Sequence, residues 1–288
     1  MKRYTFMDFE KDFPDEDACM EWLRNFLYPD GIVCRKCGKV TKHHRDNGRP
    51  SYSCDVCGHH EHPMAGTIFE DTRTPLRVWF HVIYLMASTR CGISAKQVER
   101  ETGVTYKTAW RMCHEIRTML QEDDEPMDGH VEADETYVGG KRRGMGRGYV
   151  GNKVTVFGIV ERQGRVRAVN TVDASRQSLL PIIREGVLPS ATIYTDEAQV
   201  YTGLHAHGYV HHRIHHASKV YVVGNVHTNT IEGFWSLLKR GLGGVFHAVS
   251  EKHLQGYLDE YSFRYNHRAD DEPMFVTMLS QVQKAYAD

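Results

Sequence analysis

Residues 130–138, HVEADETYV, alternate between apolar and polar side chains. An alternation with a period of two is typical of a strand that packs one face against a core. Glu132, Asp134 and Thr136 would share one face of that strand, and Glu135 would point to the other. We therefore expect this strand to carry Asp134 into a site, with Glu132 as a weaker candidate and Glu135 in a structural role.

The segments after this strand predict the rest of a sheet. KVTVFGIVER (153–162) and RVRAVNTV (165–172) are rich in β-branched residues, and Gln163-Gly164 between them predicts a hairpin turn. Then follow a helix (174–187), a short buried strand (191–196), a strand (209–216) and a helix (230–244). This order, a three-stranded meander followed by alternating helices and strands, predicts an α/β fold. We interpret residues 128–248 as a ribonuclease H-like domain, a mixed sheet flanked by helices.

Four cysteines upstream form two matched pairs, each followed by glycine: Cys34-x-x-Cys37-Gly38 and Cys54-x-x-Cys57-Gly58. Four thiolates at this spacing satisfy tetrahedral zinc, and the glycines allow a tight turn beneath the sulfurs. We expect a structural Zn²⁺ in a ribbon over residues 31–62, in preference to two disulfides or a redox-active pair. The nearby histidines are interpreted as surface residues, and three further cysteines as small core residues: His43, His44, His59, His60, His62, Cys19, Cys91 and Cys113.

Helical patterns flank the ribbon. Residues 15–28 show an apolar helical face within an N-terminal helical region, 1–30. Residues 63–122 hold three predicted helices, and the second and third are separated by a turn at Gly103 and capped by Ser94 and Thr105. This arrangement predicts a helix-turn-helix, with a plain three-helix bundle as the alternative. The expected DNA contacts are Thr105, Tyr106, Lys107, Thr108 and Arg111; the expected core residues are Val98, Val104, Ala109, Trp110 and Met112.

The formal net charge of −1 conceals a strong segregation of charge. Residues 121–135 hold eight acids and no Lys or Arg, whereas residues 139–167 hold eight Lys or Arg and one acid. The acidic segment 121–129 is interpreted as a domain boundary, and the basic loop of Lys141, Arg142 and Arg143 as a grip on the DNA backbone. Solvated loops are the alternative for both runs.

No apolar run reaches the roughly 18 residues that a membrane span needs. The N-terminal residues lack the apolar centre of a signal peptide. We therefore expect no membrane partner and a cytoplasmic location.

Three acids fall where the predicted sheet would bring them together. Asp134 lies in the first strand, Asp196 ends the strand 191–196, and Glu232 lies in the first turn of the last helix. Phosphoryl transfer on DNA uses two Mg²⁺ ions held by such carboxylates, one of which bridges the metals. Lys239, seven residues after Glu232, would project from the same helical face toward a phosphate. The alternatives are a helix-dipole role for Glu232 and a turn role for Asp196, while Glu197 is a weaker site candidate.

Histidines are dense between positions 205 and 216, where there are six, and His227 follows. Strand alternation would divide them between two faces, so we do not expect a dedicated metal site there. His216, His227, Asn225 and Asn229 flank the expected site and are candidate DNA contacts.

These motifs resemble the bacterial insertion-sequence transposases with an N-terminal zinc ribbon, the Merlin-related, ISXO2-like group. The resemblance covers almost the whole chain: CRKCG (34–38), YSCDVCG (52–58), GTIFEDTRTPLRVWF (66–80), GISAKQVERETGVTYKTAWRM (92–112), VEADETYVGGK (131–141), IYTDEAQVY (193–201) and NTIEGFWSLLKRGLGGVFHAVSEKHLQGYLDEYSFRYNHR (229–268). It implies an Asp-Asp-Glu (DDE) transposase with Asp134, Asp196 and Glu232 as the triad, and Lys239 at a position where such enzymes carry a lysine.

The resemblance further implies that the enzyme cuts at transposon ends and that the freed 3′-hydroxyl attacks target DNA. It implies double-stranded DNA as partner, in the form of terminal inverted repeats and target, and a homodimer or larger assembly that holds two ends. Mg²⁺, with Mn²⁺ as an alternative, would be the catalytic cofactor. Two rival hypotheses are a domesticated non-catalytic DNA-binding regulator and a structure-selective nuclease on the same fold.

Overall fold

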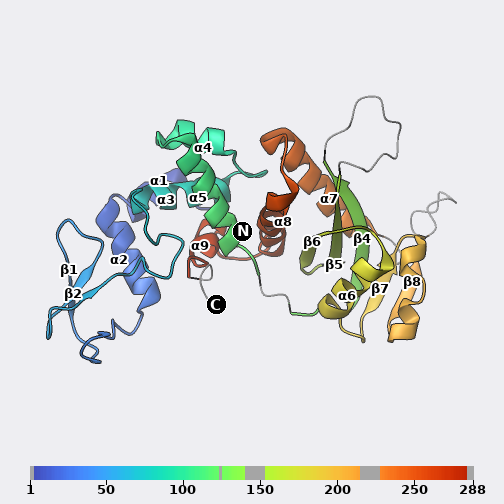
Figure 1. The fold of residues 1–288 in the computed structure, drawn as a ribbon, viewed down its shortest axis with the longest axis horizontal. Coiled ribbons are helices and arrows are strands. Elements are labelled where there is room, and N and C mark those ends of the chain that lie inside the picture. Colours follow the sequence, from blue (N-terminus) through green and yellow to red (C-terminus); the bar gives the residue numbers. More distant parts are fainter. Residues whose placement is uncertain (1–2, 123–124, 140–152, 215–227, 284–288) are drawn as a thin grey trace. The chain divides into compact units, whose positions relative to one another are not determined.

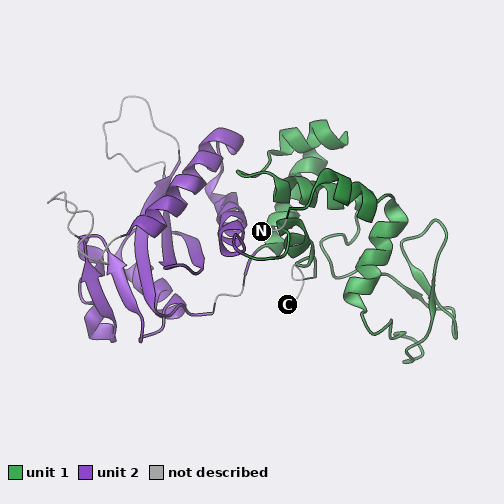
Figure 2. Cartoon of the chain, turned by 180° about the vertical axis from the view of Figure 1, so that it is seen from behind, with its two compact units in different colours: residues 1–120, 270–288 green, residues 121–269 purple. Residues whose placement is uncertain are grey.

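The computed structural model describes residues 3–122, 125–139, 153–214 and 228–283. The chain folds into two compact units (Figure 2). Unit 1 comprises Met1–Leu120 and Asp270–Asp288, and unit 2 comprises Gln121–Ala269. The sequence predicts a C-terminal helical segment over residues 249–288, and this segment is divided between the two units.

Unit 2 is built on a five-stranded sheet in the order β6-β5-β4-β7-β8 (Figure 1). The strands β6, β5 and β4 pair antiparallel as a meander, whereas β7 and β8 continue the sheet parallel to β4. The expected turn at Gln163-Gly164 joins β5 to β6, and Gln163 has a φ of 63° there. The strands are β4 (His130–Val138), β5 (Val154–Glu161), β6 (Val166–Thr171), β7 (Thr192–Thr195) and β8 (Val210–Arg213).

Helices cover both faces of this sheet, and strand alternation divides the core between them. Val131 and Ala133 of β4 pack with α6 (Arg176–Gly186) in one buried cluster. The other face packs against α7 (Asn229–Gly241) and α8 (Glu251–Asn266) in a second cluster. Glu132 and Asp134 lie on the α7 face and Glu135 on the α6 face, as the alternation predicts. Short 3-10 turns (Gln199–Tyr201, Leu204–His207) and a π-helical turn (Leu242–Phe246) complete the unit.

Unit 1 begins with helices and a small three-stranded sheet. Its elements up to the sheet are α1 (Phe6–Asp12), α2 (Glu16–Leu27), β1 (His43–Arg45), β2 (Tyr52–Cys54) and β3 (His60–Glu61). The segments SYSC (51–54) and HHEHPM (59–64), on either side of the second cysteine pair, predict short strands, and β2 and β3 lie there. The pairing of β1 with β2 was not expected, and the N-terminal helical region 1–30 forms two helices, of which α1 was not identified separately. The signal for α1 is the capping box of Thr5 and Asp8.

A helical group follows the sheet: α3 (Leu76–Ser88), α4 (Ala95–Thr102), α5 (Tyr106–Met119) and, from the C-terminal part of the chain, α9 (Met274–Leu279). Ser94 and Thr105 cap α4 and α5 through the backbone amides of Gln97 and Thr108, and Gly103 takes a φ of 72° between them. These boundaries agree with the predicted ones. The placement of Trp110 in the core is wrong, because its side chain lies on the outer face of α5 and is 37% exposed. Its ring stacks on His114, one turn later.

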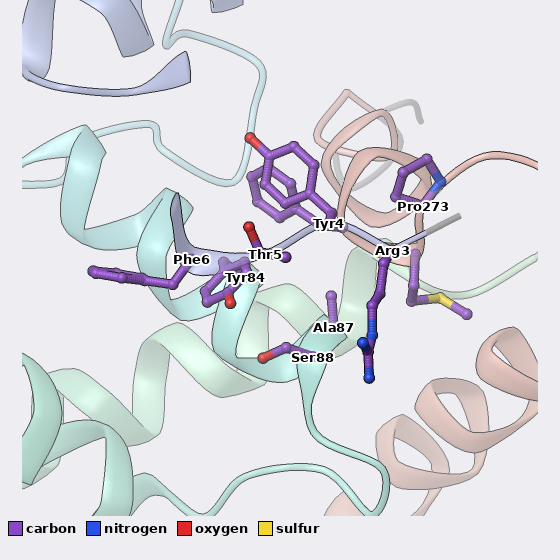
Figure 3. Close-up of a pocket in the computed structure, with 10 residues that line it drawn as sticks. Arg3, Tyr4, Thr5, Phe6, Tyr84, Ala87, Ser88 and Pro273 are labelled. Carbon is purple, nitrogen blue, oxygen red and sulfur yellow. The ribbon is translucent and has the colours of Figure 1, made fainter. Parts of the chain in front are cut away.

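The first residues of the chain pack against α9 within unit 1. The rings of Tyr4 and Phe275 lie 4.8 Å apart, and a hollow of about 420 Å³ opens beside them (Figure 3). Its walls include Tyr84 and Ser88 of α3. This packing explains why residues 270–288 belong to unit 1 although the chain reaches them only after unit 2. No helix among the described residues has both the length and the apolar character needed to cross a membrane.

Candidate functional site

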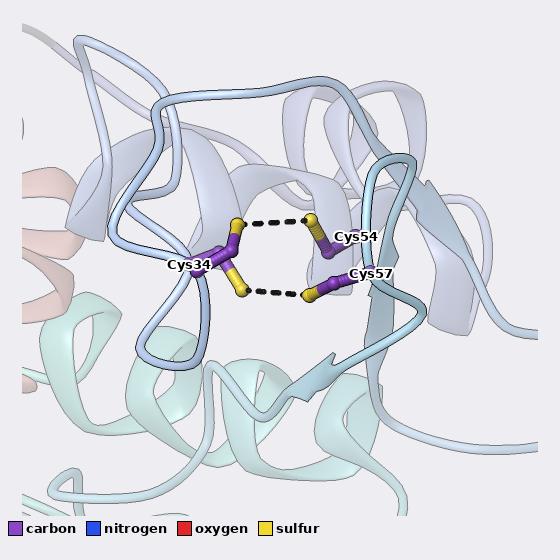
Figure 4. Close-up of side chains that lie close together, drawn as sticks. Cys34, Cys54 and Cys57 are labelled. Atoms are coloured by element: carbon purple, nitrogen blue, oxygen red, sulfur yellow. Dashed lines mark hydrogen bonds between the residues drawn. The ribbon is translucent and has the colours of Figure 1, made fainter.

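The four predicted cysteines converge in unit 1, where their ligand atoms all lie within 4.8 Å of one another (Figure 4). The sulfur atoms of Cys34 and Cys57 are 3.5 Å apart, and those of Cys37 and Cys54 are 3.9 Å apart. A tetrahedron with Zn–S bonds of about 2.3 Å has an edge of about 3.8 Å, whereas a disulfide would bring two sulfurs to about 2.05 Å. All four cysteines are free thiols. The geometry fits a tetrahedral metal site and excludes disulfides between these residues.

Local backbone geometry builds this tetrad. Gly38 and Gly58 take positive φ values of 68° and 66°, and their amides bond to the carbonyls of Cys34 and Cys54. This is the tight turn that the glycines were expected to allow. A hydrogen bond with the Thr41 hydroxyl, 3.2 Å from the sulfur, lowers the pKa of the Cys54 thiol to about 6. The thiolate is the form that binds metal.

The other cysteines and the nearby histidines stay outside the tetrad. Cys19 and Cys113 are buried, as expected of small core residues, and Cys91 is half-buried. His44 and His60 instead pair with acids, Asp55 at 3.3 Å and Asp46 at 2.7 Å.

In unit 2, Asp134 lies on β4 beneath α7. The Trp235 indole donates a hydrogen bond from Nε1 to Asp134 Oδ2 at 2.9 Å. The indole reaches this position because it lies over Gly158, the partner of Asp134 on β5. A Cβ at Gly158 would come within 2.6 Å of the indole ring, so a larger residue would displace it. This role of Trp235 and Gly158 was not predicted from the sequence. An isolated glycine within a strand signals a close approach of this kind.

Asp196 directly follows β7, the parallel neighbour of β4. The last recorded pair of these strands is Glu132 with Tyr194, two residues before Asp134 and Asp196 respectively. Burial, followed by the charge of Glu135, raises the pKa of Asp134 to about 7, and Asp196 contributes in the same direction. Among the described residues, Asp134, Asp196 and Glu232 form no ion pair with a lysine, arginine or histidine.

Glu135, on the opposite face of β4, accepts a hydrogen bond from the Tyr201 hydroxyl. Burial raises the pKa of Glu135, and the charge of Asp196 adds to the effect. Glu135 therefore lies close enough to influence the same site electrostatically, although its side chain points to the α6 face. The signal for Tyr201 in the sequence was only its place in the segment after Asp196.

Glu232 lies exposed in the first turn of α7, and its Oε1 accepts a hydrogen bond from the Thr228 hydroxyl at 3.2 Å. Within the described part of the chain, the cysteine tetrad is the only group of three or more such side chains with ligand atoms within 4.8 Å. The three acids of the predicted triad therefore do not form a closed ligand set in this structure. Carboxylates repel one another, and a divalent cation between them reverses that preference.

Lys239 is exposed in the last turn of α7. It lines a hollow of about 330 Å³ together with residues from the end of β4 and from the π-helical turn, including Gly139, Gly243 and His247. Lys239 and Glu232 thus lie on one helix, seven residues or about 10 Å apart along its axis.

Glu132, the weaker candidate on β4, is fully buried and already saturated with donors. Its Oε1 accepts from Arg162 Nε at 2.8 Å and from the Thr230 hydroxyl at 3.0 Å. Its Oε2 accepts from the amides of Thr230 at 2.9 Å and Ile231 at 3.0 Å. Four donors occupy its two oxygens, so Glu132 has no free lone pair for a metal ion.

The residues predicted to contact DNA at the start of α5 differ in their exposure and in the contacts that their side chains already make. Tyr106 and Lys107 are exposed, and the Lys96 ammonium lies 4.7 Å above the Tyr106 ring. Thr105 and Thr108 serve the helix cap, with their hydroxyls 3.1 Å apart. Arg111 reaches back to Thr72 of its own unit. Lys141, Arg142, Arg143, Asn225, His216 and His227 lie outside the described residues.

Comparisons with known proteins agree with these observations. A family model for the ISXO2-like transposase domain matches residues 126–266, and one for the transposase zinc-ribbon domain matches residues 14–60. An uncharacterized protein in transposable element ISH50 of Halobacterium salinarum is 29% identical over 273 residues, covering 88% of this chain and 92% of that protein. An uncharacterized transposase-like protein of Haemophilus influenzae is 33% identical over 120 residues, covering 42% of this chain and 94% of that protein.

Among solved structures, the simian T-cell lymphotropic virus intasome in complex with the PP2A regulatory subunit B56 gamma matches at 15% identity. The match covers 62% of this chain and 64% of that chain, with a TM-score of 0.30, which is too low to support an argument about fold.

The zinc-ribbon match and the cysteine tetrad together support a structural Zn²⁺ in unit 1. The match over unit 2 indicates the class of the protein, a transposase with an N-terminal zinc ribbon. The chain belongs to the ISXO2-like transposase family.

Proposed function

We propose that this protein is an active DDE transposase that cuts DNA at transposon inverted repeats and joins the freed ends to target DNA. The observation that carries the proposal is the parallel pairing of β4 with β7, because Asp134 and Asp196 each follow the last recorded pair, Glu132 with Tyr194, by two residues and the charge of Asp196 raises the pKa of Asp134. The bond from Trp235 to Asp134 ties α7, and with it Glu232, to the same face of the sheet. The strand order of unit 2 supports the ribonuclease H-like assignment.

The donor set indicates which metal this site would hold. All three proposed ligands are carboxylates, and hard oxygen donors suit Mg²⁺ or Mn²⁺. Asp134 and Asp196 would hold ions from neighbouring strands, and Glu232 would complete the set from α7. Bound Mg²⁺ would activate the attacking oxygen and stabilise the leaving oxygen at phosphorus. Lys239 would hold a phosphate of the same strand, about 10 Å from Glu232 along the helix.

Unit 1 would recognise the inverted repeats. In this proposal α4 and α5 form a helix-turn-helix, and α5 presents Tyr106 and Lys107 to the DNA. The basic residues Lys141, Arg142 and Arg143 would grip the DNA backbone. Two ends must be joined in one reaction, so the active form would be a homodimer or a larger assembly. The expected cytoplasmic location is part of the same proposal.

Cleavage of an oligonucleotide that carries the repeat flanking this gene tests the proposal. Glu232→Gln should lower Mg²⁺-dependent cleavage about a thousandfold, because a lost ligand is worth several kcal/mol in the transition state. End binding should stay within about twofold, since phosphate and base contacts supply it. The control is Glu251→Gln, a matched change in the first turn of α8. This variant should cleave the oligonucleotide at the wild-type rate.

The outcomes separate the rival functions. Cleavage retained in Glu232→Gln would remove this residue from the triad. A wild-type protein that cuts without joining would be a nuclease, and one that binds the repeat without cutting would be a regulator.

A further inference from the structure

A fully buried acid, Glu132, lies on β4 beside the proposed carboxylate triad. Glu132 is the central residue of a polar network that touches each of the three elements with a proposed metal ligand. On β4 it lies two residues before Asp134, on the same face. The network contains an ion pair, three further hydrogen bonds and an aromatic contact, all within unit 2.

The first branch of the network runs to α7. The N-cap residue of this helix, Thr228, makes no side-chain capping bond. Glu132 takes over that function from β4, because its Oε2 accepts from the first-turn amides of Thr230 and Ile231. A helix start has several such unpaired amides, and a carboxylate satisfies them well. The next residue is Glu232, so the carboxylate of Glu132 fixes the turn that carries the third proposed ligand.

The second branch runs to β7 through Arg162. Its Nε donates to Glu132 Oε1 at 2.8 Å, and its guanidinium lies 4.1 Å from the centroid of the Tyr194 ring. Tyr194 precedes Asp196 by two residues, and its hydroxyl lies 3.0 Å from His130 Nδ1. Arg162 therefore connects the Glu132 carboxylate to the strand that carries the second proposed ligand.

Stability alone does not account for this arrangement. A buried ion pair gains little over a well-packed apolar pair, because both charges must leave water. Its geometry, however, is directional: each donor fixes one lone pair of the carboxylate. Such a network is suited to holding groups at set positions.

We propose that Glu132, together with Arg162, is a positioning residue that sets the spacing of Asp134, Asp196 and Glu232 for their metal ions. Glu132 itself does not touch the metal, since four protein donors occupy its oxygens. The inference rests on the proposed function, because it assumes that the three acids bind divalent cations. It assigns a role to a carboxylate that would otherwise be counted as a fourth ligand.

Terbium luminescence provides a test that does not depend on activity. Tb³⁺ is a hard cation that prefers oxygen ligands, and a nearby tryptophan sensitises its emission. Trp235 is the only tryptophan in residues 121–269, and its indole bonds to Asp134. Titration of the zinc-loaded full-length protein with Tb³⁺ therefore reports on the carboxylate site.

In Glu132→Gln the Tb³⁺ concentration at half-saturation should rise about tenfold or more, the range typical for the loss of a group that orients metal ligands. Glu185→Gln is the matched control, because the exposed Glu185 pairs with Arg167 in the same unit, apart from the three proposed ligands. It should titrate like the wild type. Thr230→Ala removes one of the four bonds to Glu132 and should raise half-saturation about twofold to threefold.

The variants distinguish a failure of the proposed metal site from a failure of the positioning role of Glu132. Asp134→Asn should abolish the Trp235-sensitised signal, and a signal that persists would overturn the proposed metal site itself. A signal lost in Asp134→Asn but unchanged in a folded Glu132→Gln would overturn the positioning role. If circular dichroism shows that Glu132→Gln is unfolded, Thr230→Ala decides: wild-type half-saturation in this variant refutes the proposal, and the expected rise supports it.

Discussion

The cysteine tetrad of unit 1 and the carboxylates of unit 2 are assembled in different ways. The tetrad comes from two turns within 24 residues of sequence, and its four ligand atoms lie within 4.8 Å of one another. The carboxylates lie on β4, directly after β7 and on α7, spread over almost 100 residues of sequence, and they do not form such a closed group. A structural site is specified locally by turn geometry. The carboxylate site depends on the whole sheet and on the cations that the acids would share.

The largest effect is expected from the removal of one thiolate of the tetrad, which should affect unit 1 and leave the carboxylates of unit 2 unchanged. Cys54→Ser should abolish zinc binding and unfold the ribbon, since a domain of this size depends on its metal for folding energy. Binding to the repeat should fall about tenfold or more, measured by gel shift alongside the zinc content. Tb³⁺ binding in unit 2 should not change. Cys91→Ser, outside the tetrad, is the control, and an equal loss of zinc in both variants would contradict the assignment.

A glycine in the sheet offers a second, smaller perturbation, confined to the carboxylate site. Gly158→Ala places a Cβ within 2.6 Å of the Trp235 indole and should displace its bond to Asp134. We expect a loss of stability of about 1–3 kcal/mol, as for other overpacked cores. Cleavage should fall about tenfold, because Asp134 loses the donor that orients it.

The control for this change is Gly233→Ala on α7, where an added Cβ meets nothing within 4 Å. It should be neutral or stabilising by up to about 1 kcal/mol, since alanine favours a helix. Thermal unfolding and cleavage rates together check both variants. If both alanines behaved alike, the indole would not depend on Gly158.

The smallest expected effect concerns DNA binding by unit 1. Lys107→Ala should weaken repeat binding about fivefold at moderate salt, and the slope of log K against log salt should decrease by about one. Lys252→Ala on α8 is an exposed control in unit 2. A salt slope unchanged in Lys107→Ala would remove this residue from the DNA contacts.

The sequence allowed much of each region to be predicted, for physical reasons that differ. The tight turns at Gly38 and Gly58 and the helix caps at Ser94 and Thr105 depend on neighbouring residues only, so the residue types alone indicate them. The alternation on β4 correctly placed Glu132 and Asp134 on one face. The pairing of β4 with β7, which places Glu132 opposite Tyr194 two residues before Asp134 and Asp196, is a long-range property that alternation cannot supply.

The incorrect or missing predictions share one cause: the outcome depends on packing in the folded chain, which the local sequence pattern does not contain. Glu132 was a candidate site residue because it shares a face with Asp134, yet Arg162 and α7 saturate it. Trp110 was expected in the core on hydrophobicity alone, but the helix turns it outward beside His114. The attachment of α9 to unit 1 depends on contacts between distant segments, such as Tyr4 with Phe275.

The measurement that most directly tests the central claim is a strand-transfer assay. Purified protein, Mg²⁺ and a duplex ending in the flanking repeat are incubated with a target plasmid, and the joined product is counted. We expect joined product with the wild type and none with Asp134→Asn, although that variant should still bind the repeat. Equal joining by the two proteins would contradict the assignment of the carboxylate site.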